Sequence, residues 1–211
     1  MNKKGILVVL SGFSGSGKGT IMRELMDRYS DQYALSISVT TRKPRFCEQD
    51  GRDYFFKNRT EFESMIQHKE LIEYAEYVGN YYGTPCHYVQ EQLSLGKDVI
   101  LEIETQGGHS VKEKFPDTLL IFVAPPTAAE LHERLTARQT ETVDVINGRF
   151  KQAIEECDSI KDYDYLIIND CLDEAVERVH QIISNEHYRI ARNANKINVL
   201  KTELELFSKG E

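Results

Sequence analysis

A glycine-rich loop between an apolar run and an amphipathic segment is the feature that most limits how this 211-residue chain can fold. The run Ile6–Leu10 is short and continuously apolar, which predicts a buried parallel strand. Gly12–Lys18 follows it and fits the pattern G-x-x-x-x-G-K. Thr20–Tyr29 then places apolar side chains four residues apart, on one face of a helix. Strand, loop and helix in this order predict the first part of a β-α-β unit.

The loop has the residue types that a phosphate needs. Its glycines let successive N–H groups turn toward phosphate oxygens, and the following helix directs its positive end at them. Lys18 can place a point charge on the β- and γ-phosphates. Gly19 follows Lys18, so Thr20 would have to supply the hydroxyl near a Mg²⁺ ion. The alternative, a glycine turn with a solvated lysine, does not explain the position between strand and helix. We therefore expect a bound nucleotide at Gly12, Ser14, Gly15, Ser16, Gly17, Lys18, Gly19 and Thr20.

The rest of the chain alternates between strand and helix patterns, with two interruptions. Further strands are predicted at Val99–Ile103, Leu119–Val123 and Tyr165–Ile168, with helices after the last two, which indicates an α/β fold with a parallel sheet. We expect a core in three parts (1–37, 97–133 and 153–186), an inserted mixed β lobe at 38–96 and a small helical lid at 134–152. In the remaining part, 187–211, apolar residues recur every three or four positions, which predicts a helical extension. Its apolar stripe would pack on its own body or pair with a second subunit.

Composition excludes several classes of protein. A formal net charge of −8 disfavours broad nucleic-acid binding. The four cysteines include no Cys-x-x-Cys pair, and Cys86-His87 alone offers too few ligands for zinc. The apolar run near the start is too short for a signal peptide or a membrane span. We expect a cytoplasmic protein that does not bind membranes.

A second group of polar residues follows the first helix. Arg42 and Arg45 flank Pro44, and two neighbouring guanidinium groups are suited to a bidentate grip on a phosphate. Tyrosine hydroxyls and Thr84 can add neutral phosphate contacts. Glu73 can accept hydrogen bonds from a base that presents N–H groups, as guanine does through N1–H and its 2-amino group.

At this point the sequence resembles the guanylate kinase family, from about Gly5 to about Ile183. The family patterns T-T-R-x-P-R-x-G-E, D-G-x-D-Y and N-Y-Y-G-[ST] have counterparts here in the same order, and the first differs at its Gly. The resemblance implies that Arg42, Arg45, Tyr54 and Tyr82 hold the phosphate of GMP. It implies that Ser38, Glu73 and Thr84 read the guanine, within a substrate site that also takes in Glu48, Gly83 and Glu104. The chain departs from the pattern at Phe46-Cys47, where the family has Gly before the Glu. If that position needs a positive φ, Cys47 brings strain or a shifted loop.

Two carboxylates, Glu102 and Glu104, stand at i and i+2 after the predicted strand, at the edge where open α/β sheets bind ligands. They could be no more than a solvated strand end. The family resembles L-D-I-D followed by Q-G here, which implies that Glu102 lies near the water shell of Mg²⁺ and Glu104 near the nucleoside. Each Glu in place of Asp reaches about one methylene further.

The arginines of the predicted lid resemble the family pattern R-L-x-x-R-G-T-E followed by I-x-x-R, at Arg134, Arg138 and Arg149. Gln139 replaces the usual Gly. Arg134 and Arg138 share a helix face, and Arg149 joins that face if the helix is unbroken. By resemblance these arginines fold over ATP, and Asn169 lies near the adenine pocket.

The resemblance implies a kinase that uses ATP and Mg²⁺ to phosphorylate GMP, with dGMP as an open alternative substrate. Lys18, Arg42, Arg138 and Arg149 would share the charge of the transition state. Two alternatives remain open from the sequence: an inactive module of the same fold that binds proteins, and a P-loop kinase with another phosphate-bearing acceptor. The patterns do not decide between a monomer and a homodimer.

Overall fold

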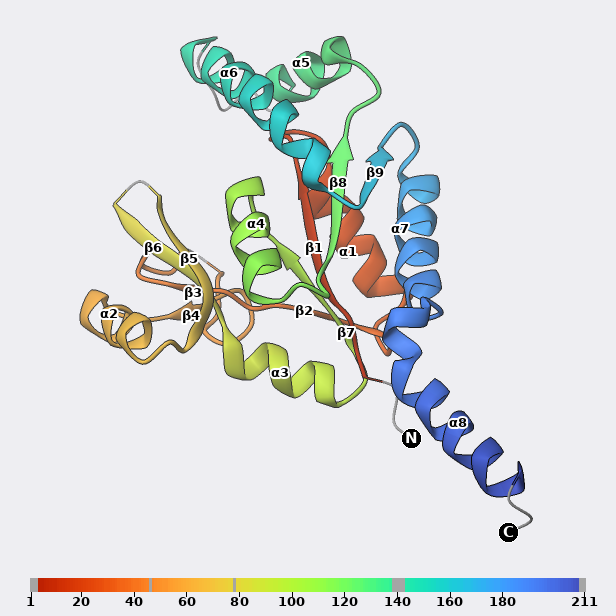
Figure 1. The fold of residues 1–211 in the computed structure, drawn as a ribbon. Helices are drawn as coiled ribbons and strands as arrows, with labels where there is room; N and C mark the ends of the chain where they lie inside the picture. Colours follow the sequence, from red (N-terminus) through yellow and green to blue (C-terminus); the bar gives the residue numbers. More distant parts are fainter. Residues whose placement is uncertain (1–3, 46, 78, 138–142, 209–211) are drawn as a thin grey trace.

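The computed structural model describes residues 4–45, 47–77, 79–137 and 143–208. Its centre is a five-stranded parallel sheet in the order β2-β7-β1-β8-β9 (Figure 1). The strands are β1 (Leu7–Gly12), β2 (Tyr33–Leu35), β7 (Asp98–Glu102), β8 (Leu119–Ala124) and β9 (Tyr165–Ile168). Val8 lies beside Ile100 in β7, and Leu10 lies beside Ile121 in β8. The predicted α/β fold with a parallel sheet is confirmed.

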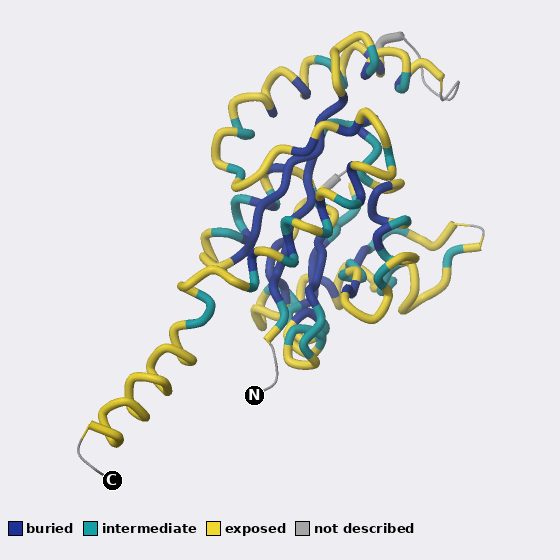
Figure 2. The backbone as a smooth tube through the Cα atoms, turned by 90° about the vertical axis from the view of Figure 1, so that its right-hand side faces the viewer, coloured by how far each residue is buried: buried dark blue, intermediate teal, exposed yellow. Residues whose placement is uncertain are grey.

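Helices cover both faces of this sheet because its central strands are apolar on both sides. On one face, α1 (Lys18–Arg28) and α7 (Leu172–Glu186) pack their apolar stripes against β1 and β8. On the other face, α3 (Cys86–Ser94) and α4 (Thr105–Lys114) contribute Val89 and Val111 to a second cluster. Figure 2 shows the resulting buried strands at the centre of the molecule. The core therefore fixes the strand ends from which the functional loops emerge.

The predicted mixed β lobe is a separate four-stranded sheet in the order β4-β3-β6-β5. Its strands are β3 (Val39–Thr40), β4 (Phe55–Phe56), β5 (Leu71–Tyr77) and β6 (Asn80–Pro85). Helix α2 (Arg59–Gln67), which begins with an Asn58–Glu61 capping box, buries Phe62 against this sheet. Because α3 packs with the core, the sheet of the lobe ends at Pro85, before the boundary expected at residue 96.

Two helices stand over the carboxyl ends of the strands. They are α5 (Ala128–Thr136), capped by the Thr127 side chain, and α6 (Val143–Ser159), which runs into the 3-10 turn η1 (Ile160–Asp162). Their apolar residues Leu131 and Ile146 form a small cluster that also contacts Phe13 of the glycine loop. Since α5 ends at Thr136, Arg134 and Arg149 belong to different helices rather than to one continuous face. Arg138 and Gln139 lie outside the described residues.

The C-terminal extension contains the predicted helix, as a 3-10 turn η2 (Ile190–Asn193) followed by α8 (Ala194–Ser208). Of the two alternatives left open by the sequence, packing on its own body is not observed, because none of the residues of α8 is buried. In Figures 1 and 2 the helix leads away from the sheet and is exposed along its length. Within the described ranges, no helix is both long and apolar enough to span a membrane.

Two glycine-to-alanine substitutions should change stability in opposite directions. A Cβ atom on Gly5 would lie 1.8 Å from the carbonyl oxygen of Lys97, so Gly5→Ala forces the backbone apart. We expect it to lower the free energy of unfolding by about 2 kcal/mol or more. Gly148 lies in α6 with open space around its Cβ position, so Gly148→Ala should raise that free energy by about 0.5–1 kcal/mol. Urea unfolding of the three proteins measures both changes, and equal stabilities would contradict the packing at Gly5.

Candidate active site

The glycine loop links β1 to α1 in a conformation that only glycine adopts easily. Gly15 and Gly17 have φ angles of 90° and 92°, in the left-handed region. A Cβ on Gly17 would lie 2.3 Å from Nδ2 of Asn169, so the close approach of Asn169, which follows β9, also requires glycine at this position. The N–H of Ser16 donates to the carbonyl of Phe13 at 3.0 Å and closes the turn. The loop therefore presents its backbone at the start of α1, as phosphate binding requires.

Lys18 bends back across this loop. Its Nζ donates to the carbonyl of Gly12 and, at 3.3 Å, to that of Phe13. The ammonium group is thereby held over the loop rather than in bulk solvent. This is the place from which it can contact the outer phosphates of a nucleotide.

Two side chains hold the loop from behind. The carbonyl oxygen of Ser16 accepts from Nδ2 of Asn169 at 2.8 Å and from Nη1 of Arg134 at 3.4 Å. Arg134 also donates to the carbonyl of Asn169 at 3.0 Å and to Glu130 at 2.8 Å. Thus α5 and the end of β9 both support the loop, and neither Arg134 nor Asn169 is among the residues that line the cavity described next.

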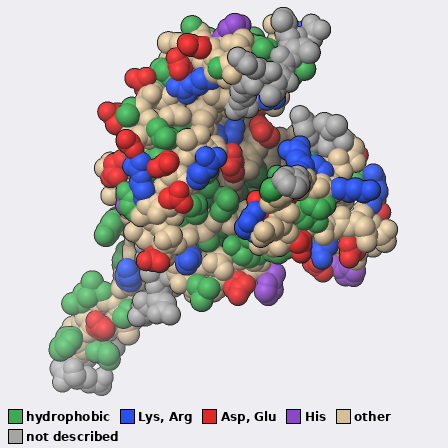
Figure 3. Space-filling view, turned by 180° about the vertical axis from the view of Figure 1, so that it is seen from behind, with side chains coloured by type: hydrophobic (Ala, Val, Ile, Leu, Met, Phe, Trp, Pro, Cys, Tyr) green, Lys and Arg blue, Asp and Glu red, His purple; other side chains and the backbone are tan. Residues whose placement is uncertain are grey.

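A cavity of about 810 Å³ lies between the core, the β lobe and α6. Figure 3 shows this hollow between the two parts of the molecule. It brings together nine residues that the sequence singled out: Ser14, Ser38, Tyr54, Glu73, Tyr82, Gly83, Glu102, Glu104 and Arg149. Residues of the predicted core, β lobe and lid therefore meet around one cavity.

Several other predicted residues lie beside the cavity rather than on its wall. Thr84 is buried behind Glu73, and Thr20 is exposed in the first turn of α1. Arg42, Arg45 and Glu48 form their own group in the β lobe. None of these five lines the cavity as the structure describes it.

Glu73 is the buried acid of the lobe, with only 8% of its surface exposed. The hydroxyl of Thr84 donates to its Oε1 at 2.6 Å. Burial raises the pKa of Glu73, while Thr84 and the charge of Lys114 lower it. A buried carboxylate with one neutral donor has free capacity for further N–H donors, and it is costly to leave without them.

Arg42 forms a bidentate ion pair with Glu48, at 3.0 and 2.8 Å. Glu48 also accepts from the backbone N–H of Arg45 at 2.7 Å, and the side chain of Arg42 and this N–H both lower the pKa of Glu48. The guanidinium lies 5.3 Å from the ring centroid of Tyr54, which links it to the cavity wall. Cys47 has a φ of 72°, so this position does need a positive φ, and the backbone strain predicted for a non-glycine residue is present. Glu48 is nevertheless held in place by its ion pair with Arg42.

Glu102 ends β7 close to the glycine loop, with its Oε1 3.6 Å from the Cβ position of Gly19. Burial raises its pKa, the ammonium of Lys18 lowers it and Glu104 raises it. A hard carboxylate beside a phosphate loop fits Mg²⁺, which is held by one or two carboxylates together with substrate phosphates and water. Among the described residues there is no cluster of three or more His, Cys, Asp or Glu that could hold a metal by itself.

Sequence reasoning missed two residues of this site. Glu156 of α6 is 7% exposed, accepts from Gln152 at 3.0 Å, and has its pKa raised by burial and by Glu104. Tyr163 donates to the hydroxyl of Ser11 at 2.7 Å, and burial raises its pKa to about 12. Arg149, Gln152 and Glu156 stand at i, i+3 and i+7 on one helix face, a polar stripe that could have identified Glu156.

A phosphate loop at the carboxyl edge of a parallel sheet, facing a second lobe across a shared cavity, defines a P-loop nucleotide-binding protein of the α/β class. A sequence model described as "Guanylate kinase" matches residues 4–186. The chain therefore belongs to the guanylate kinase family.

Individual relatives agree with this assignment. The chain is 52% identical over 193 residues to "Guanylate kinase" of Bacillus cereus, covering 92% of this chain and 94% of the relative. It is 50% identical over 196 residues to "Guanylate kinase" of Enterococcus faecalis, covering 93% and 96%. Its fold matches the crystal structure of guanylate kinase from Anaplasma phagocytophilum with a TM-score of 0.72 and 30% identity, over 91% of each chain.

Replacing the buried Glu156 should change how stability depends on pH. Its raised native pKa means that the folded protein binds the proton more tightly than the unfolded chain, so its contribution to stability falls as pH rises. Glu156→Gln mimics the protonated form and should be more stable than the parent at pH 8, by on the order of 1 kcal/mol. The difference should shrink toward pH 4.

Urea unfolding across this pH range measures the effect. Glu155→Gln, at an exposed neighbour on the same cavity, is the matched control and should show no such pH-dependent difference. A stability difference between Glu156→Gln and the parent that stays constant with pH would contradict the raised pKa of Glu156.

Proposed function

We propose that the protein transfers the γ-phosphoryl group of ATP to GMP, giving ADP and GDP. The observation that carries this proposal is that one cavity is lined both by Ser14 of the phosphate loop and by the buried Glu73 of the lobe. Arg149 reaches the same space from α6 and donates to the hydroxyl of Ser14. The relatives described above, each named guanylate kinase, support the same reaction.

The β lobe supplies the GMP site. Glu73 accepts from N1–H and the 2-amino group of guanine, with Thr84 and Ser38 completing the contacts to the base. Adenine has no N1–H and would leave the buried carboxylate of Glu73 without hydrogen-bond donors, so the site should bind AMP much more weakly than GMP. Tyr54, Tyr82, Arg42 and Arg45 take the phosphate, and Arg42 must then exchange part of its ion pair with Glu48 for the phosphate oxygens.

The core and the lid supply the ATP site. The N–H groups of the glycine loop bind the β- and γ-phosphates, and Lys18 adds a positive charge there. Arg134 and Asn169, which hold the loop from behind, lie toward the adenosine. Arg138, together with Arg149, approaches the phosphates as the lid closes.

The electrostatics of the cavity support a requirement for Mg²⁺. Arg149 is the one cation among the described residues of its lining, whereas carboxylates line it from β5, β7 and α6. Two phosphate-bearing substrates need further positive charge in such a space. Glu102, through water, and Thr20 would hold the ion, and Glu104 would lie near the nucleoside. When bound, Mg²⁺ neutralises charge on the β- and γ-phosphate oxygens.

The chemistry that the residues then perform is positioning and charge neutralisation. The lobe at 38–96 and the lid at 134–152 close on the core and bring a GMP phosphate oxygen into line with the γ-phosphorus. Lys18, Arg42, Arg138 and Arg149 share the negative charge of the transition state. Closure keeps water from the γ-phosphate and so protects ATP from hydrolysis. No covalent enzyme intermediate is needed.

The four cysteines are all unpaired, which fits a reducing cytoplasmic location.

A coupled assay of ADP release tests the reaction directly. ATP·Mg²⁺ is offered with GMP, dGMP, AMP, CMP, UMP or no acceptor, and we expect turnover with guanine nucleotides alone. Lys18→Ala should lower it by at least about 100-fold because the point charge on the phosphates is lost. A folded protein that binds GMP without turnover would be a binding module instead, and turnover with another acceptor alone would identify a different kinase.

Glu73→Gln tests the reading of the base. The amide keeps the contact with Thr84 but presents an N–H toward the N–H groups of guanine, so kcat/KM for GMP should fall about 100-fold. Glu76→Gln, at an exposed carboxylate of the same strand and the same cavity, is the matched control and should change it little. Equal losses in the two variants would show that overall charge, rather than the position of Glu73, matters.

A further inference from the structure

A β-bulge lies directly before and at Glu73 in β5. The register of β5 against β6 shifts between Leu71 and Tyr74, and a bulge of this kind changes the direction of the side chains beside it. Leu71 packs in the apolar cluster of the β lobe, whereas Ile72, 1% exposed, packs in the cluster of the core. The bulge therefore lies at the boundary between lobe and core, and it sets the direction in which Glu73 leaves the strand.

A lysine from α4 holds this bulge from the side of the core. Nζ of Lys114, in the last turn of α4, donates to the carbonyl of Ile72 at 2.5 Å. A bulge disrupts the hydrogen bonds between strands, so a backbone carbonyl within it needs a partner from elsewhere. In Figure 1, α4 lies beside both β5 and β1, which places it between the lobe and the central sheet. Lys114 thus connects the core to the backbone that carries Glu73.

One face of α4 is directed at Glu73. Gly107 and Lys114 are seven positions apart, so they share this face. The Cβ position of Gly107 is 3.5 Å from Oε2 of Glu73, while the hydroxyl of Thr84 in β6 donates to Oε1. The charge of Lys114 lowers the pKa of Glu73, against the effect of burial, and it lowers the pKa of the Cys86 thiol in the same way. Among the described residues, no other charged side chain shifts the pKa of Glu73.

We propose that Lys114 is a positioning residue for guanine recognition. Its bond to the carbonyl of Ile72 fixes the bulge, and its positive charge favours Glu73 as an ionised acceptor for the N1–H and 2-amino groups of GMP. The inference rests on the proposed role of Glu73 as the reader of the base. Lys114 acts through Glu73, because it is not among the described residues that line the cavity.

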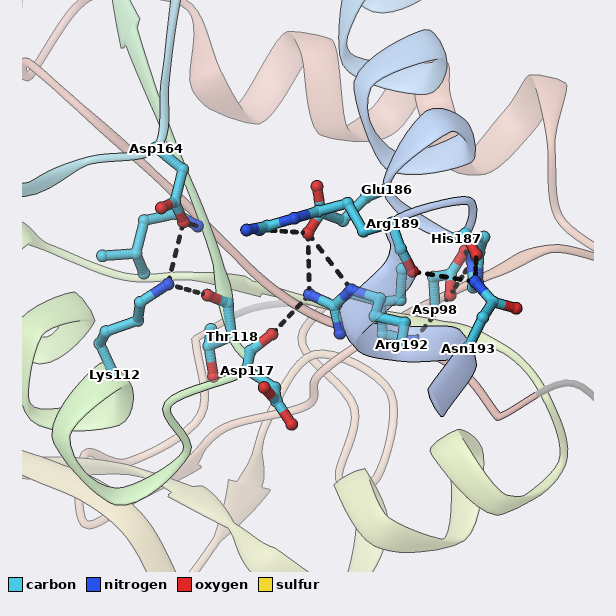
Figure 4. Close-up of polar contacts among 12 residues, drawn as sticks. Asp98, Lys112, Asp117, Thr118, Asp164, Glu186, His187, Arg189, Arg192 and Asn193 are labelled. Carbon is cyan, nitrogen blue, oxygen red and sulfur yellow. Dashed lines mark hydrogen bonds and ion pairs between the residues drawn. The ribbon is translucent and has the colours of Figure 1, made fainter. Parts of the chain in front are cut away.

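A neighbouring lysine separates this role from the stability of α4. Lysines in the last turn of a helix are favoured by the helix dipole whatever else they do. Lys112, on the other side of α4, donates to the carbonyl of Thr118 at 2.6 Å and to Asp164 at 3.1 Å (Figure 4). These bonds stay within the core and do not reach β5. Lys112 and Lys114 therefore carry the same charge on one helix, but only Lys114 contacts the strand of Glu73.

Titration with GMP, followed by calorimetry or by NMR where affinity is weak, tests the proposal. Lys114→Met removes the charge and the donor while keeping a long side chain, and it should raise the dissociation constant of GMP by at least about 5-fold. KM for GMP should rise in parallel, whereas kcat and KM for ATP should change by less than about twofold. Lys114→Arg keeps both the charge and the donor and should restore GMP affinity. Lys114 is exposed, so both variants should fold. Lys112→Met is the matched control and should leave GMP affinity unchanged.

A double-mutant cycle tests whether Lys114 acts through Glu73. In the Glu73→Gln background, Lys114→Met should change the dissociation constant of GMP by less than about twofold, because the ionised acceptor is already absent. Equal effects in the two backgrounds overturn the proposal. So does a GMP affinity that Lys114→Met leaves unchanged, or that Lys112→Met lowers by the same factor.

The same titrations separate this proposal from the proposed reaction. A parent protein that binds GMP without turnover overturns the reaction, and the effects of the variants on GMP binding then still decide the role of Lys114. A parent protein that does not bind GMP overturns both.

Discussion

The carbonyl group of Ser16 is the point on which the phosphate loop depends. It accepts hydrogen bonds from Arg134 in α5 and from Asn169 after β9, two residues that lie far from it in the sequence. These bonds leave no space for a side chain at Gly17, and they fix the loop before any nucleotide arrives. Preorganised N–H groups lose little freedom on binding, which is where such a loop gains affinity. The core, the lid helix and the last strand are therefore coupled through one backbone oxygen.

Buried carboxylates in this molecule fall into two kinds according to their partners. Glu186 and Asp98, at the amino edge of the sheet, are surrounded by arginines, a histidine and backbone N–H groups. Glu73 and Glu156, at the cavity, have single neutral donors, Thr84 and Gln152, and burial raises the pKa of each. Satisfied charges hold elements together, whereas incompletely satisfied charges retain capacity for a ligand. The same residue type thus serves structure at one end of the sheet and recognition at the other.

Substitutions that depart from the family pattern are accommodated locally. Cys47 takes a positive φ where glycine would be easier, and the bidentate pair of Arg42 with Glu48 holds the loop on either side of the strain. Glu102 keeps its carboxylate beside the glycine loop despite its extra methylene. Both changes alter reach and strain without removing a functional group from the site.

The parallel core, the phosphate loop and the mixed lobe could be predicted from the sequence, because strand apolarity, glycine spacing and ordered motifs are local properties of the chain. It also indicated Glu73, Glu102 and Arg149, since each lies in or beside a recognisable pattern. It could not find Glu156 or Tyr163, whose importance comes from burial against residues distant in sequence, nor the ion pair that occupies Arg42. The apolar period predicted α8 but not where its stripe faces. That direction depends on tertiary contacts, because the bonds from His187 to Asp98 and from Arg192 to the carbonyl of Asp117 join parts of the chain that are far apart in the sequence.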